Sequence, residues 1–128
     1  MTERDGKTVI LVVDDEPLVR NVVQMTLIRA GYDVFAASDG TEALHLSRAY
    51  TGAIHLLLSD VKIPNMIGTE LATTIMKERP GIHVLLMTGK SLGGIPSQLR
   101  LGLLRKPFLP RQLLEQIHRA LGKEEQRL

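Results

Sequence analysis

Residues 9–16 read Val-Ile-Leu-Val-Val-Asp-Asp-Glu, five apolar residues followed by three acids. A short, continuous run of β-branched and aliphatic residues is typical of a strand buried on both faces of a parallel sheet. Because a parallel strand must be followed by a crossover, we expect a helix before the next strand. The three acids then lie at the carboxyl end of the strand, where open parallel sheets place their binding sites.

Outward from this stretch, further apolar runs alternate with segments of helical spacing. The strands are expected at residues 33–37, 54–59, 83–88 and 103–105 in addition to 9–13. Helices are expected from Pro17 to just before Gly31, from Thr69 to just before Pro80, and from Pro110 to just before Gly122. Another is expected where residues 39–42 fit a capping box before Ala43, Leu44 and Leu46. The helical spacing of the first helix predicts one core-facing stripe made of Leu18, Val22, Val23, Leu27 and Ile28.

This alternation predicts one doubly wound α/β domain with helices on both faces of a parallel sheet. The domain is expected to span residues 9–122, between a polar segment at 1–8 and a charged tail at 123–128. The connection 89–102 is the weakest part of the pattern. Glycines and Pro96 interrupt it, so that at most a short fourth helix fits around residues 97–101.

Composition excludes several classes of function. The chain has 128 residues, and sixteen basic against fourteen acidic side chains leave a net charge of +2, which argues against a dedicated nucleic-acid-binding domain. No apolar run approaches the roughly 18 residues that span a bilayer, and residues 1–8 lack the apolar core of a signal peptide. The absence of cysteine excludes disulfides and thiol catalysis, and it predicts a cytoplasmic protein.

Complementary side chains follow the expected strands at one edge of the sheet. They are Asp14, Asp15 and Glu16 after the first strand, Asp60 after the third, Thr88 after the fourth and Lys106 after the fifth. Carboxylates held close together repel one another, and a hard divalent cation such as Mg²⁺ offsets that repulsion. Acids, a metal, a hydroxyl and an ammonium together favour phosphoryl transfer, with Asp60 as a nucleophile. Taken singly, each residue has an ordinary alternative as a helix cap, a turn residue or a solvated side chain.

In combination, four segments carry a more specific signal: VILVVDDEP (9–17), LLLSDVKIPNMIG (56–68), VLLMTG (84–89) and LLRKPF (103–108). Together they resemble the receiver domain of two-component response regulators, over about residues 9–121. The resemblance implies a flavodoxin-like, five-stranded parallel sheet with strand order 2-1-3-4-5. It also implies a function in phosphorelay signalling, in which a histidine kinase or a phosphotransfer domain donates a phosphoryl group from a phosphohistidine.

Site residues follow from the same resemblance. It implies that Asp60 is the phosphoacceptor and that Asp14 and Asp15 bind Mg²⁺, Asp15 more directly and Asp14 partly through water. The backbone carbonyl of Lys62 is implied as a further metal ligand. Contacts to phosphoryl oxygens are implied for Thr88 and Lys106. The resemblance also implies a cis peptide between Lys106 and Pro107, and a turn behind Asp60 that the missing Cβ of Gly68 relaxes.

The chain departs from the family pattern in two places. Leu103 stands where the family usually has an aromatic switch residue, and the short interval between Thr88 and Lys106 resembles receivers fused to hybrid histidine kinases. A covalent fusion to a kinase or effector is therefore compatible with the sequence. The alternative function is a Mg²⁺-dependent phosphohydrolase with an aspartyl-phosphate intermediate. Such enzymes usually carry a second acid two residues after the nucleophile, and that position is Lys62 here.

Overall fold

The computed structural model describes residues 6–89 and 103–122. Five parallel strands form one sheet in the order β2-β1-β3-β4-β5. Their bounds are β1 Val9–Val13, β2 Asp33–Ala37, β3 Leu56–Asp60, β4 His83–Thr88 and β5 Leu103–Arg105. This arrangement confirms the doubly wound, flavodoxin-like fold. The expected short fourth helix at 97–101 and the tail at 123–128 lie outside the described residues.

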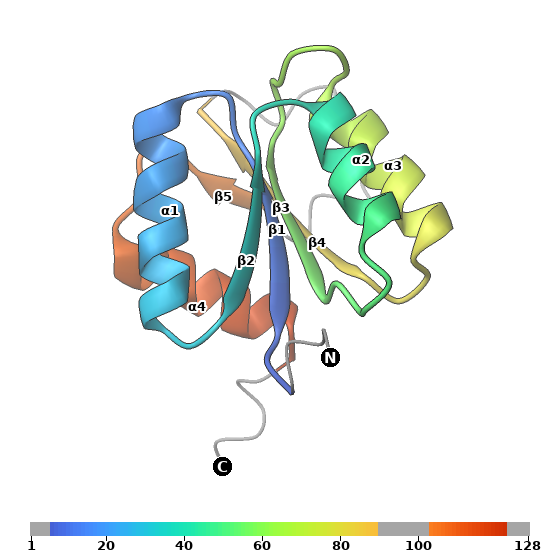
Figure 1. The fold of residues 1–128 in the computed structure, drawn as a ribbon. Helices are drawn as coiled ribbons and strands as arrows, with labels where there is room; N and C mark the ends of the chain where they lie inside the picture. The colour runs from blue at the N-terminus through green and yellow to red at the C-terminus, as the bar shows by residue number, and fades with distance from the viewer. Residues whose placement is uncertain (1–5, 90–102, 123–128) are drawn as a thin grey trace.

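Helices cover both faces of the sheet (Figure 1). The described residues form α1 Pro17–Arg29, α2 Gly40–Ala49, α3 Gly68–Glu78 and α4 Pro110–Ala120. Helices α1 and α4 lie against one face, and α2 and α3 lie against the other. Pro17 occupies the first turn of α1, and Gly31 follows the helix with a φ of 100°, as the sequence pattern predicts.

Strand β1 lies at the centre of two separate hydrophobic cores. Val9, Leu11 and Val13 face α2 and α3, whereas Ile10 and Val12 face α1 and α4. All five residues are buried, which explains why the run is continuously apolar rather than alternating. The opening stretch of sequence therefore determines the layer arrangement as well as the position of the strand.

Three sequence-based expectations need correction. The third strand runs from Leu56 to Asp60 rather than over 54–59, so Asp60 is the last residue of the strand itself. Helix α3 begins at Gly68, one residue earlier than expected. The apolar stripe on α1 is only partly a core face, because Val23 and Leu27 are buried while the other three members are exposed: Leu18, Val22 and Ile28.

Candidate functional site

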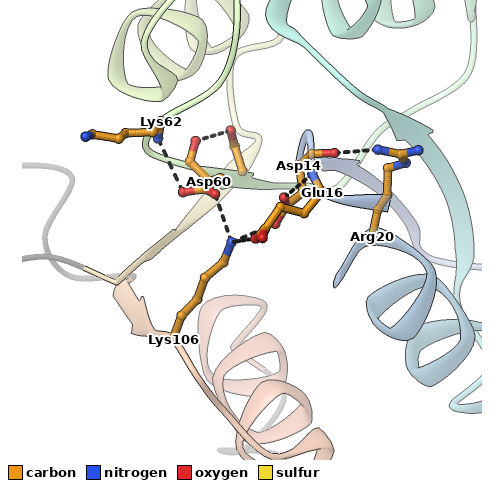
Figure 2. A network of polar contacts seen from close by, with 7 residues as sticks. Asp14, Glu16, Arg20, Asp60, Lys62 and Lys106 are labelled. Atoms are coloured by element: carbon orange, nitrogen blue, oxygen red, sulfur yellow. Dashed lines mark hydrogen bonds and ion pairs between the residues drawn. The ribbon is translucent and has the colours of Figure 1, made fainter. Parts of the chain in front are cut away.

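The carboxyl ends of β1, β3 and β5 bring oppositely charged side chains together (Figure 2). The Lys106 ammonium donates hydrogen bonds to Asp14 Oδ2 at 2.9 Å and to Asp60 Oδ2 at 2.8 Å. Glu16 Oε1 lies 3.6 Å from the same nitrogen. Because β1 and β3 are neighbours whose following helices cover opposite faces, this cluster lies at the switch point of the sheet, the usual site position in open α/β sheets.

The central groups of this cluster are shielded from water to different degrees. Asp14 is completely buried, whereas the side chains of Asp60 and Lys106 are 14% and 17% exposed. Burial alone lowers the pKa of Lys106, but the hydrogen bonds to Asp60 and Asp14 and the attraction of their charges outweigh it. The pKa of Lys106 is therefore raised above its ordinary value, and the ammonium remains charged throughout the neutral range.

Asp14 is held by hydrogen bonds from several directions. Its backbone N–H donates to the Ala37 carbonyl on β2 at 3.1 Å. Its Oδ1 accepts the Glu16 N–H at 3.0 Å, and its carbonyl oxygen accepts Arg20 Nη1 at 2.8 Å. Together with the bond from Lys106, these contacts fix the backbone and the side chain of Asp14 at the end of β1.

Three carboxylates lie within reach of a single cation. One oxygen from each of Asp14, Asp15 and Asp60 lies within 4.8 Å of the others. The ammonium of Lys106 offsets only part of this negative charge. Oxygen ligands and residual negative charge fit a hard divalent ion such as Mg²⁺, which prefers a few carboxylates and retains several waters. Asp15 is exposed, so water can complete the coordination there.

The segment that follows Asp60 lies tightly against it. The Lys62 backbone N–H donates to Asp60 Oδ1 at 3.3 Å, while the Lys62 side chain points away from the acids (Figure 2). A Cβ atom on Gly68 would overlap the carbonyl oxygen of Asp60, and the Gly68 N–H donates to the Val61 carbonyl at 2.7 Å. Glycine is therefore required by close backbone packing behind Asp60.

Thr88 and Lys106 are adjacent through their backbones. Thr88 ends β4 and is buried, and its carbonyl oxygen accepts the Lys106 N–H at 2.8 Å. The peptide between Lys106 and Pro107 is cis, as the resemblance implies. All the side chains expected at this edge of the sheet thus come from strand ends that the structure places next to one another.

Sequence reasoning missed Arg20, whose guanidinium contacts the main chain of Asp14. A signal was available, because a long side chain in the first helical turn points back toward the helix N-terminus. Arg20 is four residues after Glu16, which occupies the N-cap position of α1.

The comparison with protein families agrees with this geometry. Residues 10–118 match the family model described as the response regulator receiver domain. The chain belongs to the receiver domain family. Among the described residues of this receiver, no helix combines the length and apolar character needed to cross a membrane.

Curated relatives of the receiver include a sensor kinase and transcriptional regulators. Sensor kinase CckA of Brucella abortus is 30% identical over 97% of this chain and 14% of that protein. The alkaline phosphatase synthesis regulator PhoP of Bacillus subtilis is 35% identical over 91% of this chain and 49% of that protein. The receiver therefore spans at most about half the length of these relatives.

Solved structures agree with the fold. The CheY-like receiver of Methanospirillum hungatei gives a TM-score of 0.79 at 32% identity, covering 94% of this chain and 98% of the other. The chemotaxis regulator CheY4 of Vibrio cholerae gives 0.80 at 31% identity, covering 90% and 99%. These findings do not favour the phosphohydrolase alternative. The chain also has Lys62 at the position where such enzymes usually carry their second acid.

Proposed function

We propose that this receiver takes a phosphoryl group from a phosphohistidine onto Asp60 and changes conformation in response. The observation that carries the proposal is the position of the Asp60 carboxylate. It lies at the carboxyl end of β3, hydrogen-bonded to Lys106 and within 4.8 Å of carboxylate oxygens of Asp14 and Asp15. The only reaction that we assign to the chain is its own phosphorylation and dephosphorylation.

A bound Mg²⁺ would neutralise charge on the phosphoryl oxygens. We assign its ligands to Asp14, Asp15, Asp60 and the backbone carbonyl of Lys62. The three carboxylates support this assignment by their mutual distance, and the Lys62 carbonyl by its place two residues after Asp60. Asp14 is fully buried and fixed by hydrogen bonds, whereas Asp15 is exposed. The exposed position of Asp15 supports its assignment as the more direct ligand.

The transfer step needs a nucleophile, a leaving group and donors for the phosphoryl oxygens. An Asp60 carboxylate oxygen attacks phosphorus, and the phosphorus–nitrogen bond of the donor histidine breaks with its electron pair remaining on the imidazole. The imidazole then takes a proton from water. Lys106 and Thr88 donate to the phosphoryl oxygens, which requires Lys106 to exchange a carboxylate partner for the new group. Attack of water on phosphorus later releases phosphate and restores the carboxylate.

A histidine kinase or phosphotransfer domain is the proposed partner. An apolar groove supports it, because the groove begins at the site and continues along α1. Glu16 and Lys106 line one end, followed by Leu18, Val22 and Phe108. A partner that brings a phosphohistidine to Asp60 covers this groove, and an apolar helix face suits it.

We infer a cytoplasmic location, which the lack of cysteine supports. A fusion to a kinase or effector domain is compatible with the greater length of the relatives.

Phosphorylation by a small donor tests the acceptor directly. With acetyl phosphate and Mg²⁺, the intact mass should rise by one phosphoryl group, and hydroxylamine should remove it because an acyl phosphate is labile. Asp60→Asn should abolish the increment. Asp33→Asn, at the opposite end of the sheet, should leave it unchanged. Uptake by Asp60→Asn at the parent rate would exclude Asp60 as the acceptor.

A further inference from the structure

Arg20 forms a contact that links helix α1 to the end of β1. Its Nη1 donates to the carbonyl oxygen of Asp14 at 2.8 Å, and Figure 2 shows the side chain reaching back from the helix. Arg20 is only partly exposed and lies in the first turn after the connection 14–16. The hydrogen bond therefore ties the start of this connection to the first turn of α1.

Asp15 depends on that loop for its position. It is exposed, yet its carboxylate oxygen lies within 4.8 Å of oxygens from Asp14 and Asp60. The Asp14 carbonyl and the Asp15 Cα belong to one planar peptide group, so a bond that holds the carbonyl also restrains the Cα from which the Asp15 side chain leaves the backbone. At the N-cap of α1, Glu16 makes no side-chain capping bond, so the Arg20 bond holds this turn together with the bond from the Glu16 N–H to Asp14 Oδ1.

We propose that Arg20 is a positioning residue that keeps Asp15 aimed at the cation shared with Asp14 and Asp60. The inference rests on the metal site of the proposed function but not on phosphorylation. The charge of Arg20 and its hydrogen bond predict opposite effects on Mg²⁺ affinity when Arg20 is removed. If only its charge mattered, loss of a nearby cation would strengthen Mg²⁺ binding, whereas loss of the hydrogen bond should weaken it.

Mg²⁺ titration followed by amide chemical shifts separates these two effects. Arg20→Met should raise the Kd for Mg²⁺ about tenfold, the size typical of losing a residue that orients a metal ligand. Arg29→Met removes the same charge from the exposed last turn of the same helix and should leave the Kd nearly unchanged. Arg20→Lys keeps a charge and a donor, and its Kd should lie between those of the parent and Arg20→Met.

A second measurement needs no metal. In metal-free Arg20→Met, the amides of Asp15 and Glu16 should exchange faster with solvent, while the buried amides of β1 should keep their protection. If Arg20→Met does not fold, the same comparisons are made with Arg20→Lys. A Kd equal to or below the parent value in the folded variant would overturn the inference. A parent that binds Mg²⁺ but never takes phosphate would instead contradict the proposed function alone.

Discussion

At the residue scale, Lys106 acts as a built-in counter-ion for two shielded carboxylates. Its ammonium bonds both Asp14 and Asp60, so a divalent cation and a phosphoryl group must each compete with it or recruit it. Through these two hydrogen bonds, we expect a single lysine to respond to events at both acids. A change that removes the ammonium should therefore lower the stability of the metal-free receiver and raise its affinity for metal.

Lys106→Met should therefore destabilise the metal-free receiver and strengthen Mg²⁺ binding. Two facing carboxylates left without a cation should lower the free energy of unfolding by about 1–3 kcal/mol. Because the folded-state pKa of Lys106 is raised, its contribution is complete below the unfolded pKa of about 10.4 and is lost as the pH rises through the folded value. Urea unfolding in a chelator should thus give a constant difference from the parent between about pH 7 and 9.

Lys77→Met, which removes an exposed lysine from α3, is the matched control. It should change neither stability nor Mg²⁺ affinity. Weaker Mg²⁺ binding in Lys106→Met than in the parent would show that the ammonium does not compete with the cation.

Residue identity and strand order were enough to predict which acids and which lysine meet, but not how they are held. The sequence shows Asp14, Asp60 and Lys106 at strand ends, and parallel pairing then places those ends side by side. Individual hydrogen bonds depend on side-chain conformation, which sequence spacing does not specify. The bond from Arg20 to the Asp14 carbonyl was therefore missed, although its helical position is consistent with it.

At the element scale, α1 shows why an apolar pattern alone does not define a core face. Val23 and Leu27 are buried against the sheet, but Leu18 and Val22 are 79% and 56% exposed. Sequence periodicity gives the width of an apolar stripe, whereas only the packing of α1 beside α4 determines how much of that stripe is covered. The exposed Leu18 and Val22 continue the groove that begins at Lys106.

If a protein donor contacts this groove, Leu18→Ser should separate two kinds of phosphorylation. Transfer from a phosphorylated histidine kinase should slow by about tenfold or more, because burying a leucine side chain is worth about 1.5–3 kcal/mol. Phosphorylation by acetyl phosphate should keep its rate, since that donor needs no docking surface. The measurement is the initial rate with each donor at the same Mg²⁺ concentration.

Met76→Ser provides the control on the opposite side of the sheet. Met76 is a partly exposed apolar residue of α3, and its replacement should affect neither rate. An equal loss with both donors in Leu18→Ser would point to damage at the site, and an unchanged kinase rate would place the donor elsewhere.

At the scale of the whole molecule, the sheet forces like charges together and thereby links metal binding to folding. Parallel pairing of β1 with β3 places Asp14 and Asp15 beside Asp60 in every folded molecule, whereas the unfolded chain separates them. The repulsion is therefore present only in the native state, and so is the proposed metal site. Such a site stabilises the fold by mass action without being needed for folding, because two apolar cores are already complete on either side of the sheet.

Asp15→Asn tests this link, because Asp15 is exposed and its replacement preserves shape while removing one charge. Without metal, the variant should be more stable than the parent by about 1 kcal/mol, the scale of one solvent-screened repulsion. The parent should gain about 2.7 kcal/mol when Mg²⁺ reaches 100 times its Kd, and the variant should gain far less at that concentration. Glu115→Gln removes an exposed acid from α4 and should leave the Mg²⁺-dependent gain intact. Urea unfolding of the three proteins with and without Mg²⁺ measures all six stabilities, and an equal Mg²⁺-dependent gain in Asp15→Asn and the parent would remove Asp15 from the proposed metal site.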